Sequence, residues 1–171
     1  EYGTDPTDPD TDGDGLADGA EVAASDDAGV TAPDDTGGTA LEGADPLRMD
    51  VFVELDYMGE AEPPPEAIAL VTEAYADAPV ENPDGSTGIS LHVVVDDRIP
   101  TDDRTEWAEM DGLIAEHFDR EGMGYRYGVA VLDVRANGTD AAGAAVSGAE
   151  DGQFMFETVP ATETNATRRT A

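Results

Sequence analysis

The residues from Asp10 to Glu21 have the types and the spacing of a twelve-residue calcium-binding loop. Carboxylates stand at loop positions 1, 3, 5, 9 and 12, and Gly15 stands at position 6, where the backbone must turn sharply. The main-chain carbonyl at position 7 is the remaining expected ligand. The predicted metal ligands are Asp10, Asp12, Asp14, Leu16 (through its carbonyl), Asp18 and Glu21.

Carboxylates gathered around one point repel one another by roughly 1–4 kcal/mol per close pair at a surface-like dielectric constant. A divalent cation reverses that repulsion, and Ca²⁺ suits such a loop because it takes about six to eight oxygen ligands in flexible geometry. The alternative is a solvated acidic loop that binds nothing, since the whole chain is acidic. Acidity alone does not explain ligand positions in register with a glycine at the turn, so the pattern favours a specific calcium site.

The chain has 40 Asp and Glu residues against 8 Lys and Arg, which gives a formal charge of −32. Lysine is absent, and every basic residue is an arginine. Nucleic acid is excluded as a partner, because binding to phosphates needs clustered basic side chains. An acidic excess of this size is typical of a protein built for very high salt, where a Debye length of about 3 Å at 1 M screens self-repulsion.

The chain has no cysteine, which excludes disulfides and thiolate metal sites. No apolar run approaches the roughly 18 residues that a bilayer span requires, so no membrane span is predicted. We interpret the chain, which starts at Glu1 without a signal peptide, as a segment of a longer protein. N-glycosylation sequons, which would suit an extracellular location, begin at Asn137 and Asn165.

Residues 1–46 and residues 47–171 differ in composition and are predicted to be separate domains. The first part is rich in Asp, Gly, Thr and Pro and has little core to bury. We therefore expect a mostly irregular segment that is largely disordered without metal. Within it, the sequence predicts a short helix around Gly19–Ala24 and a solvated acidic stretch over Ser25–Gly43.

The phrase Gly-x-Asp-Pro occurs at Gly3–Pro6 and again at Gly43–Pro46, before and after the loop. With the run D-T-D-G-D-G-L-x-D-G-x-E between them, residues 3–46 resemble a thrombospondin type 3 calcium repeat of microbial surface proteins. The similarity is close over Asp5–Val22. It implies an extracellular or cell-surface spacer that calcium makes rigid, with the six ligands predicted above.

In the second part, strand patterns alternate with helix patterns. Strands are predicted over residues 49–58, 89–95, 125–134 and 153–157, helices after Pro65 and after Asp103, and a Gly/Ala-rich loop over 136–152. Asp103 and Glu106 are a candidate capping pair for the second helix. The order β-α-β-α-β-β implies an α/β fold, with a small, mostly parallel sheet and two crossover helices.

The sequence predicts no catalytic residue. His92 and His117 form no H-x-x-x-H pair and are assigned structural or surface roles. No serine stands in a G-x-S-x-G motif. Two carboxylate pairs could act as acid and base, but in so acidic a chain we interpret them as solvated strand ends: Glu54 with Asp56, and Asp96 with Asp97.

The phrases Asp50–Met58 and Asn82–His92 are similar to the N-terminal half of a metzincin-like zinc protease domain, of the kind attached to surface proteins of halophilic archaea. That resemblance implies a twisted sheet with two helices, followed by a helix that carries H-E-x-x-H and holds zinc and the general base. The chain contains no H-E-x-x-H, so no zinc ligand or catalytic residue carries over. In a protease of this family the catalytic helix would lie beyond Ala171.

Three interpretations follow from these patterns. The chain is a calcium-binding surface module, a fragment of a secreted zinc metalloprotease, or a non-catalytic structural or adhesive surface protein. The first two are compatible, because a calcium spacer can precede a protease domain. Calcium is the predicted cofactor, with zinc only if the second half of the protease exists, and the sequence identifies no protein or peptide partner.

Salt should stabilise the fold. We expect the melting temperature to rise between dilute buffer and molar KCl or NaCl, because added ions screen the repulsion of a chain with a charge of −32. Scanning calorimetry measures this directly. A melting temperature that does not rise would contradict the interpretation of the charge as a salt adaptation.

Overall fold

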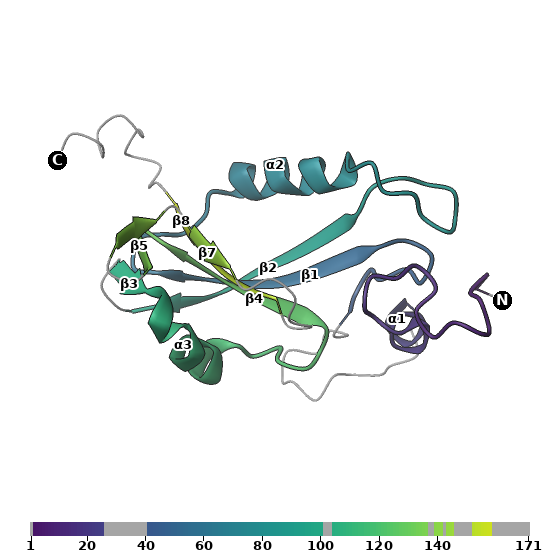
Figure 1. The fold of residues 1–171 in the computed structure, drawn as a ribbon, viewed down its shortest axis with the longest axis horizontal. Coiled ribbons are helices and arrows are strands. Elements are labelled where there is room, and N and C mark those ends of the chain that lie inside the picture. The colour runs from purple at the N-terminus through teal and green to yellow at the C-terminus, as the bar shows by residue number, and fades with distance from the viewer. Residues whose placement is uncertain are drawn as a thin grey trace. The chain divides into compact units, whose positions relative to one another are not determined.

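The structure is a computed structural model, and it describes residues 2–25, 41–100, 104–136, 139–141, 143–145 and 152–158. Figure 1 labels most of its helices and strands. In chain order they are α1 (Asp18–Ser25), β1 (Asp50–Met58), α2 (Pro65–Ala76), β2 (Ser90–Ile99), β3 (Arg104–Glu106), a 3-10 helix (Trp107–Glu109), α3 (Met110–His117), β4 (Tyr125–Val131), β5 (Asp133–Ala136), β6 (Thr139–Ala141), β7 (Gly143–Ala145) and β8 (Gln153–Glu157). None of the described helices is long and apolar enough to cross a membrane.

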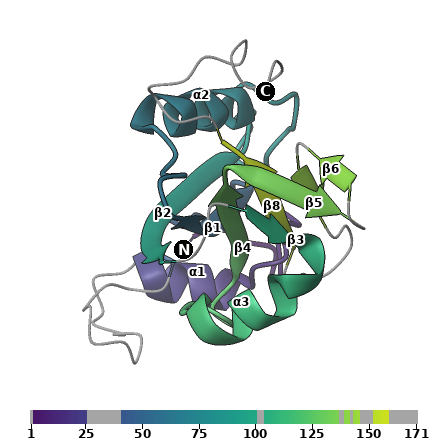
Figure 2. The same ribbon diagram turned by 90° about the vertical axis from the view of Figure 1, so that its left-hand side faces the viewer.

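A five-stranded sheet has the order β2-β1-β4-β8-β7, in which β4 is central and β4 and β8 run parallel. The Ser90 N–H donates to the Met49 carbonyl (2.9 Å) where β1 and β2 begin. The Gly59 N–H donates to the Ile99 carbonyl (3.1 Å) where they end, so these two strands also run in the same direction. A second sheet has the order β3-β5-β6, and Figure 2 shows β5 beside β6. The predicted α/β class with a small, mostly parallel sheet is confirmed.

The chain forms two compact units, each built from several segments. The first comprises Glu1–Phe52, Leu70–His92 and Arg120–Tyr125, and therefore holds the calcium-type loop, α1 and the opening residues of β1 and β2. The second comprises Val53–Ala69, Val93–Asp119 and Arg126–Ala171, and holds the rest of those strands. The domain boundary predicted after residue 46 stays a prediction.

Two acids of β1 are buried in the second unit. Glu54 and Asp56 are both 0% exposed, so their interpretation as solvated strand ends was wrong. Asp56 accepts hydrogen bonds from the Asp97 N–H (2.8 Å) and from the Tyr127 hydroxyl (2.7 Å). Glu54 accepts one from the Asp119 N–H (2.9 Å). β1 lies between two other strands and is buried on both faces, which its alternating sequence pattern does not show.

The two helices after β1 have features that the sequence patterns did not indicate. α2 buries none of its residues, and Leu70 is 65% exposed and Val71 49% exposed, so the apolar positions of this helix do not form a covered face. The 3-10 helix before α3 begins with a capping box between Glu106 and Glu109. The predicted partner Asp103 lies outside the described residues.

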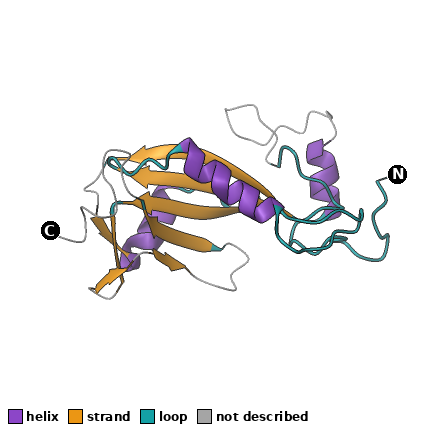
Figure 3. Ribbon diagram, turned by 90° about the horizontal axis from the view of Figure 1, so that it is seen from above, coloured by secondary structure: helices purple, strands orange, loops and turns teal. Residues whose placement is uncertain are grey.

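The Gly/Ala-rich segment predicted as a loop contains β6 and β7, which Figure 3 includes among the strands in orange. Small residues allow this close pairing: a Cβ at Gly143 would lie 3.0 Å from the Met155 carbonyl oxygen of the neighbouring strand. β4 ends at Val131 rather than at Val134, because the chain then enters β5 of the second sheet. Asp96 and Asp97 are exposed, as expected.

Removing the hydroxyl of Tyr127 should destabilise the protein. Tyr127→Phe leaves one oxygen of the buried Asp56 carboxylate without its donor, which costs about 1–3 kcal/mol. Urea denaturation measures this loss, and Tyr75→Phe on α2, where the side chain is 38% exposed, is the matched control. Equal stabilities of the two variants would contradict a structural role for the Tyr127–Asp56 bond.

Candidate metal centre

The loop that precedes α1 is folded by its own carboxylates. Asp10 accepts hydrogen bonds from the N–H groups of Gly13 (2.9 Å) and Gly15 (3.1 Å), and both glycines have positive φ, at 79° and 96°. Residues other than glycine rarely adopt a positive φ, which explains why a glycine stands at the sharp turn. The Asp18 carboxylate accepts from the Thr11 N–H (2.7 Å) and the Thr11 hydroxyl (2.8 Å), and this contact fixes the place where α1 begins.

Two groups of acids bring potential ligand oxygens within 4.8 Å of one another. The first group is Asp10, Asp12 and Asp14, from the loop itself. The second is Asp14, Glu21 and Asp50, which joins the loop to α1 and to the first residue of β1. Asp14 belongs to both groups, and all these residues lie in the first compact unit. The structure therefore brings four predicted ligands together and adds Asp50.

Glu21 is the most unusual member of these groups. Its side chain is 0% exposed, and neither carboxylate oxygen has a hydrogen-bond partner among the described residues. One oxygen of Asp12, a residue that is 8% exposed, is also buried without a partner. Buried polar groups normally find partners, and burying a lone carboxylate costs several kcal/mol. A cation among these oxygens would satisfy them, so the residues present fit a metal ion.

The surroundings of Glu21 oppose its ionisation. Burial, followed by the charges of Asp14, Asp12, Asp50 and Asp18, raises the pKa of Glu21 to about 8. Burial and the neighbouring Asp14 raise the pKa of Asp12 to about 6, and burial also raises the pKa of Asp14. Without a cation, a proton relieves this repulsion, and a bound divalent cation would displace that proton.

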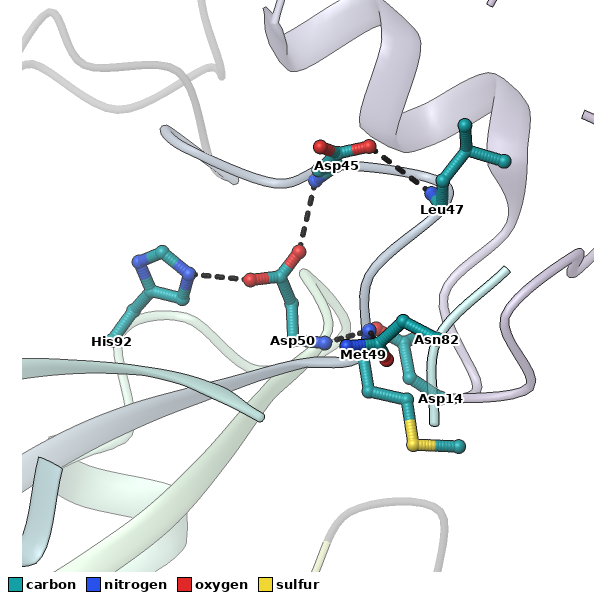
Figure 4. Close-up of polar contacts among 7 residues, drawn as sticks. All are labelled: Asp14, Asp45, Leu47, Met49, Asp50, Asn82 and His92. Atoms are coloured by element: carbon teal, nitrogen blue, oxygen red, sulfur yellow. Dashed lines mark hydrogen bonds and ion pairs between the residues drawn. The ribbon is translucent and has the colours of Figure 1, made fainter. Parts of the chain in front are cut away.

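Asp50 was missed by sequence reasoning. Figure 4 shows its contacts: its N–H donates to the Asp14 carboxylate (2.8 Å), and its own carboxylate accepts from the Asp45 N–H (2.9 Å) and from His92 Nε2 (2.6 Å). The His92 ring also stacks on Phe52 at 4.2 Å between centroids, and its predicted structural or surface role stays a prediction. A signal was present, because Asp50 follows the second Gly-x-Asp-Pro phrase at the interval that separates Asp10 from the first.

Two predicted ligands lie outside both acid groups. The oxygens of Asp18 are engaged by Thr11. The Leu16 side chain lies against Gly124, where a Cβ would approach Leu16 Cδ2 to 2.6 Å. Coordination by the Leu16 carbonyl and by Asp18 stays a prediction.

The sequence also singled out a second histidine and two sequon residues. His117 Nδ1 lies 3.8 Å from Asp97 Oδ2 in the second unit, and this histidine belongs to neither acid group. The sequon residues Asn137 and Asn165 lie outside the described residues. Most of the acidic stretch over Ser25–Gly43 lies outside them as well.

Without metal, the protein should lose stability as the pH rises. The pKa of Glu21 is about 8 in the folded chain against an ordinary value of 4.5, so between these values the folded state holds a proton that the unfolded state has released. The stabilisation that this proton gives is complete below about pH 4.5 and is lost as the pH rises through about 8. Glu21→Gln lacks the titration but keeps the shape of the protonated acid.

Urea titrations in the presence of a chelator test this expectation. Between about pH 5 and pH 8, the free energy of unfolding of the unsubstituted chain should fall relative to that of Glu21→Gln. The comparison removes the contributions of the other carboxylates, which both proteins share. Parallel curves for the two proteins would show that Glu21 titrates at its ordinary value.

Comparison with known proteins supports the metal-binding character of the loop. Residues 10–24 match the family model of the bacterial TSP3 repeat, and this match confirms the type 3-like segment. The matched residues include Asp10, Asp12, Asp14 and Glu21. No curated protein and no solved structure matches the chain significantly, so the metzincin-like nature of residues 47–171 stays a prediction.

Proposed function

We propose that the chain is a calcium-binding module, in which Ca²⁺ is held by the carboxylates of the loop and of α1. One observation carries the proposal: Glu21 is fully buried, has no hydrogen-bond donor among the described residues, and offers a ligand oxygen within 4.8 Å of those of other acids. It stands at position 12 of a loop that matches a known repeat, where calcium loops carry a carboxylate.

The chemistry of the donors favours calcium over other metals. Both acid groups among the described residues consist of carboxylates alone, and hard oxygen ligands suit Ca²⁺ and Mg²⁺, whereas zinc prefers histidine and cysteine. Mg²⁺ requires near-octahedral geometry and gives up its water reluctantly. A loop that offers several carboxylates at once therefore suits Ca²⁺ better.

Calcium would make the N-terminal segment rigid. The metal-free loop holds several mutually repelling acids at close range, and the ion would turn their repulsion into attraction. We place the module outside the cell or on its surface, which the TSP3 match supports. There, a weak affinity of about 10⁻⁴–10⁻³ M would suffice. The charge of −32 supports the further proposal that the protein works in high salt.

The other two interpretations of the sequence are compatible with this proposal. A zinc protease would need ligands that the two acid groups of the described residues do not contain, since these groups include no histidine. An adhesive role would need a binding surface for a partner. Both stay predictions, and the calcium proposal does not depend on either.

Glu21→Gln should weaken calcium binding strongly. The amide preserves the shape of the side chain but removes its charge and one ligand oxygen, so we expect the calcium affinity to fall at least about tenfold. Isothermal titration calorimetry measures the affinity. Glu73→Gln, which removes the same charge from an exposed position on α2, is the matched control and should change affinity less than about twofold.

Circular dichroism should show that Glu21→Gln remains folded in the absence of calcium, because the amide replaces a carboxylate that lacks a donor. If the unsubstituted chain binds no calcium, or if Glu21→Gln binds it as tightly as Glu73→Gln does, the proposed function is wrong.

A further inference from the structure

We infer that Asp50, the first residue of β1, is a ligand of the same calcium ion, so that the ion ties the loop and α1 to the start of the strand. This inference rests on the proposed function. It adds to the site a residue that lies outside the calcium-type loop and outside the matched residues 10–24.

The positions of the carboxylate oxygens of Asp50, Asp14 and Glu21 support this assignment. Asp50 is 3% exposed, and its carboxylate lies within 4.8 Å of the ligand atoms of Asp14 and Glu21. In the part of the chain that the structure describes, Glu21 finds no donor, and its neighbours in this group are two further carboxylates, which are acceptors when ionised. A cation shared by all three removes the unsatisfied charge of Glu21 and the repulsion among them together.

The hydrogen bonds of Asp50 leave room for a metal ion. Its two carboxylate oxygens accept one bond each, from Asp45 N–H and from His92 Nε2. A carboxylate oxygen has two lone pairs, so each oxygen keeps one for a cation. The two donors hold the carboxylate in place, and such outer contacts are a regular feature of metal ligands in proteins.

A structural repeat in the chain gives independent support. Gly3 and Gly43 both have positive φ, at 86° and 93°. In each Gly-x-Asp-Pro phrase, the aspartate accepts two hydrogen bonds from main-chain N–H groups that follow it. Its carboxylate accepts one from the residue two positions later, and its main-chain carbonyl accepts one from the residue three positions later. The acceptors are Asp5 and Asp45.

The second phrase therefore folds like the first and delivers an aspartate at the same interval: Asp10 after Gly3, and Asp50 after Gly43. Asp50 thus occupies the place of the first ligand of a following loop. The chain does not build that loop, because Phe52 stands where its second acid would be and Leu55 where its turn glycine would be, and it continues as β1. Asp50 is left to serve the preceding site.

Calcium bound in this way would stabilise more than the loop. The Met49 N–H donates to the Asn82 side chain (3.2 Å), and Asn82 in turn donates to the Gly88 carbonyl (3.0 Å). The ligand Asp50 is thus joined through its neighbour Met49 to the turn before β2. An ion held by the loop alone would have no direct bond to this part of the unit.

The experiment compares Asp50→Asn with Asp84→Asn in the full chain by calcium titration in the calorimeter. Asp84 lies in the same compact unit, is exposed, and offers an oxygen to the Ser86 N–H that asparagine can replace. Asp50→Asn should weaken calcium binding at least about tenfold, and Asp84→Asn less than about twofold. Side chains that bind one ion act as a unit. The calcium affinity of the double variant Glu21→Gln/Asp50→Asn should therefore fall by a smaller factor than the product of the factors for the two single variants.

A second measurement keeps the test decisive if Asp50→Asn misfolds. In the unsubstituted chain, saturating calcium should slow hydrogen exchange of the Asp50 amide at least about tenfold, along with the Gly13 and Gly15 amides of the loop. The Asp97 amide, in the other compact unit, is the internal control.

The outcomes separate the two proposals. If the unsubstituted chain binds no calcium, the proposed function fails. If it binds calcium but the affinity of Asp50→Asn is unchanged, or if calcium protects the loop amides without protecting Asp50, only the role of Asp50 is overturned.

Discussion

A buried carboxylate without a donor is the constraint on which the first compact unit depends. Glu21 has no solvent exposure and no hydrogen bond to any residue that the structure describes, and Asp12, Asp14 and Asp50 surround it with further negative charge. Only a proton or a cation can relieve this arrangement. A proton neutralises one oxygen, whereas calcium can bind several carboxylates at once. The same contacts that weaken the metal-free unit would therefore strengthen the calcium-bound one.

The acids of this chain fall into groups with different physical roles. Most of the acids whose burial the structure describes are exposed, and all the acids together set the charge of −32. Glu54 and Asp56 are buried as deeply as Glu21, but both accept hydrogen bonds from main-chain or hydroxyl donors. Burial alone therefore does not identify the metal centre. What distinguishes Glu21 from these structural acids is that none of the described residues donates a hydrogen bond to it.

Local patterns predicted the local features well. The register of the loop, the turn at Gly15 and the helix that follows all appear in the structure, because each depends on contacts within a few residues. Strands β1, β2, β4 and β8 and their mostly parallel order also followed from the alternation of patterns, whereas β3, β6 and β7 were not predicted. Features set by distant segments were not predicted. The burial of Glu54 depends on the strands that flank β1, and the exposure of Leu70 depends on which elements pack against α2.

Asp50 lies between these two cases. Its contact with Asp14 joins residues far apart in the chain, which periodicity does not show. Its position after the second Gly-x-Asp-Pro phrase was nevertheless visible in the sequence. The spacing is informative only if the two phrases fold in the same way. The structure shows that they do, because the turns at Asp5 and Asp45 have the same hydrogen bonds. An internal repeat can thus locate a ligand that is distant in sequence, once the structure shows that both copies fold alike.

A crystal structure of the chain grown with calcium tests the central claim most directly. The account predicts an ion bonded to the Glu21 carboxylate at about 2.3–2.6 Å, the usual calcium–oxygen distance, with Asp14 as a common neighbour. A calcium-soaked structure in which Glu21 stays buried and bonded only to protein donors, with no ion beside it, would contradict the account.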